Sequence, residues 1–185
     1  MAGCSTPDSA MDQWMATDFT RERILNADAT TVSVGYYEGG VYNNYWVLIF
    51  SYPENSHTED YRQEVLNLVN AQRAKYGLTA LKMGDDALTA AAQTRAEEIA
   101  VVNSHVRPDG SKCFTVLKDY GVTDTPTGEN AAWGSVSPEE VVNAWMNSEG
   151  HRANILNPEA RKMSVGYYYN SNSTWGHQWI QIFTK

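Results

Sequence analysis

A histidine distinguishes two otherwise similar stretches of this sequence. The segment WMNSEGHRANILN (145–157) repeats the frame of WMATDFTRERILN (14–26), but His151 stands where the first copy has Thr20. A neutral imidazole can bind a metal ion or act as a general base near neutral pH. One copy therefore carries a side chain capable of chemistry, whereas the other keeps only the surrounding residues.

No compact catalytic motif accompanies this histidine in the sequence. The chain lacks the H-E-x-x-H pair of a metalloprotease helix and any segment that resembles a nucleophile elbow. Its two cysteines, Cys4 and Cys113, lie too far apart for a redox or zinc-ribbon spacing. They could form a disulfide, but nothing near either one indicates it. Any site must therefore be assembled by the fold from residues that are distant in sequence.

Composition excludes several classes of protein. The chain has 185 residues, enough for one domain or slightly more, and 42% of them are hydrophobic, as in ordinary globular proteins. A net charge of −8 argues against nucleic-acid binding, which needs clustered basic residues. No apolar run approaches the roughly 20 residues of a membrane span. The chain opens without the charged and apolar segments of a secretion signal, so we expect any such signal to be missing or already removed.

The similarity extends well beyond the two stretches around His151 and Thr20. GCSTPDSAMDQWM (3–15) aligns with GSVSPEEVVNAWM (134–146), SVGYY occurs at 33–37 and 164–168, and WVLIF (46–50) aligns with WIQIF (179–183). Aligned Trp, Gly, Pro and Tyr residues make chance similarity of composition a poor explanation. We predict that residues 1–52 are a second copy of residues 132–185, whereas the segment from about 53 to 131 occurs once.

Local sequence signals predict two helices and a β-hairpin in each copy. Ser137 is a good helix N-cap, because Pro138 follows it and Glu140 stands three residues on. A second, short helix is expected from Ser148 to Leu156. The aromatic runs KMSVGYYY and HQWIQIFT flank a turn-rich segment, which is typical of a β-hairpin. The first copy follows the same plan.

The unique middle is predicted to be mostly helical. One helix is expected between Ser56 and Gly77, with one apolar face formed by Tyr61, Val65, Leu68, Val69 and Tyr76. A second begins at Asp85 or Asp86 and carries, at helical spacing, Leu88, Ala91, Ala92, Arg95, Ile99 and Val102. A loop-rich stretch then leads to GENAAWG (128–134).

Residues 59–185 resemble one complete module of the CAP superfamily, the cysteine-rich secretory, antigen 5 and pathogenesis-related-1 proteins, also called SCP-like. Six motifs occur in the family's order: VLNLVNAQRAKYGLTAL, LTAAAQTRAEEIA, SHVRPDGSKCFTVL, GENAAWG, AWMNSEGHRANIL and VGYYY…WIQIF. The form is similar to the bacterial branch. The resemblance implies an α+β fold, an α-β-α sandwich around a small antiparallel sheet. Residues 1–52 then resemble the degenerate C-terminal half of another module, with residues 53–58 as a linker.

The resemblance also implies a cleft lined by histidines and acids. His105 matches the histidine of the family's SH motif, Glu129 the acid of GEN, and His151 the histidine of the GHR that bacterial members carry. These three residues are the core of the expected site.

Two further positions of the family's cleft do not match cleanly. Ser148 stands where plant and animal members have a second glutamate, and Glu149 follows it. Gln178 stands where they have a histidine on the last strand, and His177 precedes it. Because a one-residue step along a strand reverses the face, His177 is expected to point away from the cleft. These four residues are auxiliary candidates.

The expected site allows three chemistries. Two imidazoles and a carboxylate are adequate ligands for Zn²⁺, with a fourth position open to water. A His–Glu pair could instead be a general base with its orienting acid, with Ser104 or Ser148 as a nucleophile in a peptidase-like hydrolase. A purely structural role is the third, in which Glu129 accepts backbone amides and His151 forms hydrogen bonds within its helix.

We expect a secreted or surface-displayed bacterial binding module, with the hydrolase as the alternative. Its ligand would be a small molecule, a lipid or a peptide. Most tryptophans are expected in the core, Trp145 among them, and Trp175 at a hairpin tip is the best candidate for an exposed contact. A homodimer through residues 1–52 is also expected, because that half-module would leave apolar side chains partly uncovered, namely Val34, Tyr36, Trp46, Leu48 and Phe50.

Overall fold

The computed structural model describes residues 1–26, 29–51 and 58–185. These residues form two compact units, residues 1–56 and 57–185, each with its own buried cluster of apolar side chains. The linker expected at residues 53–58 lies outside the described residues except for Thr58, as does the helix start expected at Ser56.

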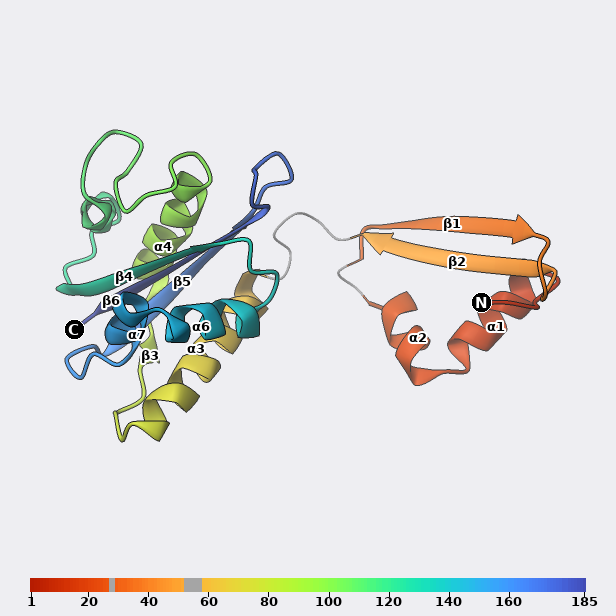
Figure 1. The fold of residues 1–185 in the computed structure, drawn as a ribbon, viewed down its shortest axis with the longest axis horizontal. Helices are drawn as coiled ribbons and strands as arrows, with labels where there is room; N and C mark the ends of the chain where they lie inside the picture. The colour runs from red at the N-terminus through yellow and green to blue at the C-terminus, as the bar shows by residue number, and fades with distance from the viewer. Residues whose placement is uncertain (27–28, 52–57) are drawn as a thin grey trace. The chain divides into compact units, whose positions relative to one another are not determined.

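Unit 2, residues 57–185, contains the larger part of the fold (Figure 1). Its helices are α3 (Thr58–Lys75), α4 (Asp86–Ile99), a 3-10 turn (Cys113–Thr115), α5 (Val116–Asp119), α6 (Pro138–Asn147) and α7 (Glu149–Ile155). Its strands are β3 (Lys82–Met83), β4 (Pro126–Trp133), β5 (Lys162–Tyr169) and β6 (His177–Thr184). They form one sheet in the order β3-β5-β6-β4, antiparallel except where β3 meets β5.

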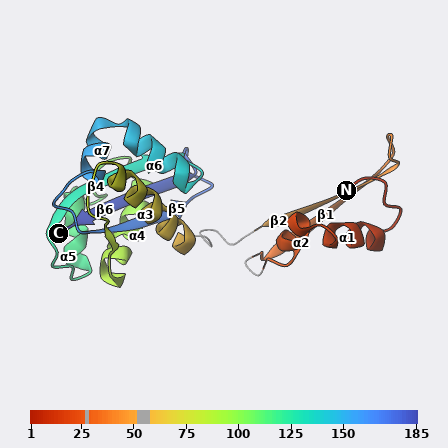
Figure 2. The same ribbon diagram turned by 90° about the horizontal axis from the view of Figure 1, so that it is seen from below.

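The sheet of unit 2 is covered on both faces by helices (Figures 1 and 2). One face packs with α3, α6 and α7 in a cluster that includes the fully buried Trp145 and Trp179. The other packs with α4 and α5 through the buried Ile180 and Ile182. The predicted α+β sandwich is therefore confirmed. Tyr76, expected on the apolar face of α3, is exposed because the helix ends at Lys75.

Glycine lets α4 lie directly on the sheet. A Cβ atom at Gly166 would lie 1.9 Å from the backbone oxygen of Ala92, so no other residue fits there without moving the helix. α4 begins at an N-cap, Asp85, whose side chain accepts a hydrogen bond from the backbone N–H of Leu88. This close packing fixes the helix face that carries Arg95.

Unit 1, residues 1–56, holds two helices and one hairpin. They are α1 (Pro7–Met15), α2 (Asp18–Ile24), β1 (Thr31–Glu38) and β2 (Asn44–Ser51), and the two strands pair antiparallel. Its core is small and centres on Cys4, Ala10 and Trp14. Val34 is 61% exposed and Tyr36 50% exposed, so the predicted incomplete covering of this hairpin is confirmed.

No helix among the described residues is long and apolar enough to cross a membrane.

Candidate functional site

A buried carboxylate is the centre of the candidate site. Glu129 lies on β4, and its side chain is 2% exposed. Arg95, on α4, is fully buried and donates to both carboxylate oxygens, from Nε at 3.0 Å and from Nη2 at 3.3 Å. Such a two-point pair satisfies two charges that burial would otherwise make costly. Burial works against the charge on Glu129, but the hydrogen bonds from His105 and Arg95 outweigh it and lower the pKa of the carboxyl group.

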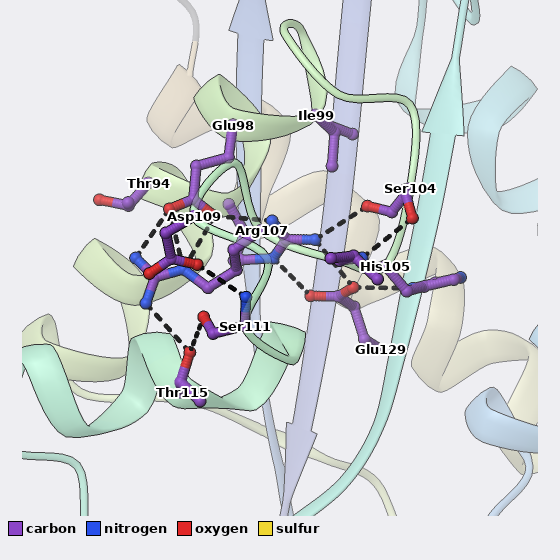
Figure 3. Close-up of polar contacts among 12 residues, drawn as sticks. Thr94, Glu98, Ile99, Ser104, His105, Arg107, Asp109, Ser111, Thr115 and Glu129 are labelled. Carbon is purple, nitrogen blue, oxygen red and sulfur yellow. Dashed lines mark hydrogen bonds and ion pairs between the residues drawn. The ribbon is translucent and has the colours of Figure 1, made fainter.

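His105 joins this pair from the loop after α4. Its Nδ1 lies 2.8 Å from Oε1 of Glu129. Figure 3 draws this contact as a dashed line. The hydrogen bond to Glu129 raises the pKa of His105 against the opposing effect of burial. Because the carboxylate is ionised, Nδ1 carries the proton and donates a hydrogen bond to Glu129. The imidazole side chain is still 53% exposed, so its other nitrogen, Nε2, is open to a ligand.

Further ion pairs hold the loop that carries His105 (Figure 3). Arg95 donates to the backbone oxygen of Ser104 at 3.1 Å and to Glu98 at 2.6 Å. Glu98 also accepts from Arg107 at 2.7 Å, and Arg107 donates to Asp119 at 2.7 Å. The residues before and after His105 are therefore both tied to α4, which restricts the directions the imidazole can take.

His151 lies on α7, the helix that packs against β4. Amide side chains tie this helix to β4: Asn130 donates to the backbone oxygen of His151 at 3.1 Å, and Asn154 donates to the backbone oxygen of Glu129 at 3.2 Å. Gly128 leaves room for this contact, since a Cβ there would lie 2.6 Å from Oδ1 of Asn154. Burial lowers the pKa of His151, and the positive charge of His105 lowers it further. The charge of His105 therefore affects the protonation of His151.

The hydrogen bonds of Glu129 suit a residue that orients His105 better than they suit a metal ligand. Its Oε1 accepts hydrogen bonds from Arg95 and His105, and its Oε2 accepts one from Arg95. The described residues contain no group of three or more His, Cys, Asp or Glu side chains placed to hold a metal ion. A carboxylate bonded to one imidazole nitrogen is the arrangement that orients a histidine whose other nitrogen binds a metal. Nε2 of His105 and the ring of His151 are the imidazole groups that could serve as zinc ligands.

The four auxiliary candidates lie at the start of α7 and on β6. Ser148 is the residue between α6 and α7, and Glu149 is exposed at the start of α7. His177 packs with the ring of Tyr169, and its Nδ1 lies 2.9 Å from the hydroxyl of Tyr167, whose ring belongs to the sheet face covered by α3 and α6. This is the face opposite to Glu129, as the strand register predicts. Gln178 is fully buried and forms a hydrogen bond with the hydroxyl of Ser173 in the hairpin loop (2.7 Å).

Two residues of the site were not identified from the sequence. The sequence places Arg95 on the apolar side of its helix. A buried cation needs a buried anion as its partner, but the sequence does not show which acid this is. Cys113 also lies beside Glu129: burial, together with the charge of Glu129, raises the pKa of its thiol to about 11. Cys4 and Cys113 are both free cysteines.

The sequence matches the model of a known family. The model of the cysteine-rich secretory protein family, CAP, matches residues 66–183. The chain belongs to the CAP family. The uncharacterised protein YkwD of Bacillus subtilis is 42% identical over 122 residues, which cover 65% of this chain and 47% of YkwD. The uncharacterised membrane protein YlbC of the same bacterium is 32% identical over 115 residues, 60% of this chain and 33% of YlbC.

Solved structures of bacterial CAP proteins share the fold. An extracellular protein of Bacillus anthracis with an SCP domain superposes with a TM-score of 0.62 at 24% identity, over 76% of this chain and 47% of that one. An outer surface protein of Borrelia burgdorferi also gives 0.62, at 22% identity, over 71% of this chain and 96% of that one. The chain is thus a CAP protein of the bacterial type. It spans about half the length of YkwD and a third of that of YlbC.

Proposed function

We propose that this CAP protein is a binding module whose ligand is held by the imidazoles of His105 and His151. The observation that carries the proposal is the buried Arg95–Glu129 pair, which orients a half-exposed His105 whose second nitrogen remains open. Folding alone does not require a buried ion pair here, because apolar side chains of similar volume often give a protein of equal stability. We therefore assign the Arg95–Glu129 pair the role of orienting the exposed ring of His105. Candidate ligands are a divalent metal, of which zinc suits imidazoles, and a small molecule, lipid or peptide with a hydrogen-bond donor for Nε2.

The two histidines differ in protonation, and this sets the pH dependence of metal binding. Metal ions bind the neutral imidazole, so binding releases protons. The pKa of His105 is raised and that of His151 is lowered. Zinc binding should therefore weaken as the pH falls through the raised pKa of His105, above the ordinary value of about 6.5.

Calorimetry with Zn²⁺ tests the metal-binding form of the proposal. The wild type should release heat above neutral pH, and the His105→Ala/His151→Ala variant should not. The His177→Ala variant is the matched control, because His177 is half-buried on the other face of the sheet. Equal heats from the wild type and the double variant would remove these two histidines as the metal site.

The hydrolase alternative receives less support. Cys113, the thiol beside Glu129, stays protonated because its pKa is raised to about 11. The hydroxyl of Ser104 accepts a hydrogen bond from the backbone N–H of Val106 at 3.0 Å, in the loop after α4. We expect no turnover of generic peptide or ester substrates. Turnover that is lost in the His151→Ala variant would instead favour the hydrolase.

We also propose that the protein acts outside the cell or at its surface. Two solved proteins with this fold are described as an extracellular protein and an outer surface protein. Cell fractionation with an antibody to the chain tests this, and detection in the cytosol alone would contradict it.

A further inference from the structure

A pocket of about 320 Å³ opens in unit 2 where α5 meets the start of β4. Its walls are mainly apolar and come from Phe114, Leu117, Val122 and Pro126. The three residues expected at the core of the cleft, with Glu129 at its centre, do not line it. Sites for small organic molecules usually measure about 300 to 1,000 Å³ and have such a lining. The space is therefore large enough for a small molecule and separate from the site already described.

Local structure shapes one wall of this pocket. The 3-10 turn and α5 form one continuous helical stretch, in which Phe114 and Lys118 are four residues apart and so lie on the same side. Leu117 is buried in the cluster that packs with α4. Gly121, with a φ of 69°, ends the helix. The N–H of Val122 then donates to the backbone oxygen of Leu117 at 2.9 Å, which brings the chain back beside α5. The wall is thus held in place by the core, while Phe114 and Val122 stay only partly buried.

Two lysines give the pocket a positive charge. Lys112 and Lys118 line it and are exposed, and within the described part of the chain no acid forms an ion pair with either of them. The acid in the pocket wall, Asp124, is already paired with Lys162 at 2.7 Å and accepts a hydrogen bond from Thr184 at 3.3 Å. A cleft lined by one sign of charge attracts the opposite sign. The charge that complements this pocket is therefore negative, although the chain as a whole carries −8.

We propose that this pocket binds a small organic anion, a molecule with an apolar body and a single carboxylate. The body fills the space between Phe114 and Val122, and the carboxylate meets the ammonium groups of Lys112 and Lys118. A neutral apolar molecule would fit the walls equally well but would leave both ammonium groups without an anionic partner. The carboxylate therefore supplies the selectivity, and the apolar body supplies most of the contact area.

An extended peptide fits this place less well than a small molecule. β4 is the end strand of its sheet, and such edges can bind a peptide by strand addition. The pocket, however, lies at the first residue of β4, Pro126, which has no backbone N–H to donate. Proline at the start of an edge strand discourages added strands. We therefore assign the pocket to a free small acid.

Three compounds with one body test the proposal. They are phenylbutyrate, phenylbutanol and phenylbutylamine, in which the same chain joins a terminal phenyl ring to an anionic, a neutral or a cationic head group. NMR titration of the isotope-labelled full chain should show saturable binding of phenylbutyrate in the millimolar range, as expected for so small a molecule. The backbone N–H signals of Phe114, Leu117 and Val122 should shift. Phenylbutanol should bind roughly fivefold more weakly, and phenylbutylamine more weakly still.

Lysine variants show whether the two ammonium groups select the anion. Lys112→Gln/Lys118→Gln should weaken the binding of phenylbutyrate roughly fivefold and leave that of phenylbutanol unchanged, because only the anion meets the ammonium groups. Lys75→Gln/Lys82→Gln is the matched control, since it removes the same charge at two exposed lysines that do not line the pocket. It should bind phenylbutyrate like the wild type.

The His105→Ala/His151→Ala variant separates this pocket from the site proposed above, and it should bind phenylbutyrate like the wild type. Loss of binding in that variant would place the anion at the histidines and overturn the proposal. So would the absence of saturation, equal binding of the three compounds, or equal binding of phenylbutyrate by the wild type and Lys112→Gln/Lys118→Gln. Tighter binding of an acetylated peptide that ends in phenylalanine would make a peptide C-terminus, not a small acid, the occupant.

Discussion

At the scale of single residues, the site depends on the hydrogen bonds that Glu129 accepts from Arg95 and His105. Arg95 and His105 both donate to the carboxylate of Glu129, so each stabilises the negative charge to which the other is bonded. His105 gains a raised pKa from this bond. A raised folded-state pKa contributes stability that is present below the unfolded pKa of about 6.5 and is lost as the pH rises through the folded value.

Glu129→Gln is predicted to lower the pKa of His105. The amide keeps the shape of the carboxylate but removes the negative charge that favours the imidazolium. An NMR titration of the histidine ring protons measures the change, and His177 on the opposite sheet face serves as the internal control. An unchanged pKa for His105 would mean that Glu129 does not orient it.

The sequence led to His105, Glu129 and His151 because the order of six motifs identified the family. It did not lead to the pairing of Arg95 with Glu129, because that contact joins residues 34 apart through the packing of α4 on the sheet. The part that Glu129 plays depends on this pairing. A carboxylate without Arg95 would have been free to bind a metal.

At the scale of elements, the contact between α4 and β5 positions the site. Gly166→Ala is predicted to destabilise the protein by at least about 2 kcal/mol, because the helix must move to admit the methyl group. Gly150→Ala is the matched control: no atom lies within 4 Å of its added Cβ, so the free energy of unfolding should change by less than about 1 kcal/mol. Urea denaturation of the two variants measures the difference, and equal stabilities would contradict the close packing.

Trp145 is the largest fully buried side chain of α6. Trp145→Ala should cost about 3 to 5 kcal/mol, as large-to-small changes of buried aromatic residues do. The exposed Trp175, 52% exposed in the hairpin loop, is the matched control, and its replacement by alanine should have a small effect. A loss below about 1 kcal/mol for Trp145→Ala would show that the indole is not part of the core.

Elements with strong local signals were predicted well, and those that depend on tertiary contacts were not. The N-caps Ser137 and Asp85 and the hairpin strands β5 and β6 are where the sequence places them. The stretch that ends in GENAAWG was expected to be loop-rich, yet β4 spans Pro126–Trp133. Gly, Glu, Asn and Ala have low strand propensity, and the segment becomes a strand because β6 offers it an edge.

At the scale of the whole molecule, the two units differ in how fully their sheets are covered. Unit 2 has helices on both faces, whereas unit 1 exposes apolar side chains on both faces of its hairpin, among them Val34 and Ile49 at 61% and 63%. The origin of unit 1 as a duplicated half-module stays a prediction, which the matching elements support. Such exposed apolar surfaces favour contact between copies.

A homodimer through residues 1–52 is therefore predicted for the isolated chain. Light scattering should give a mass above that of one chain for the full protein, and the mass of one chain for residues 54–185. Val34→Lys/Ile49→Lys places a charge on each exposed face of unit 1 and should make the full chain monomeric. Val101→Lys/Val136→Lys, at two exposed valines of unit 2, should leave the dimer unchanged. If the full chain and residues 54–185 are both monomers of equal stability, residues 1–52 do not mediate self-association, and the dimer prediction is wrong.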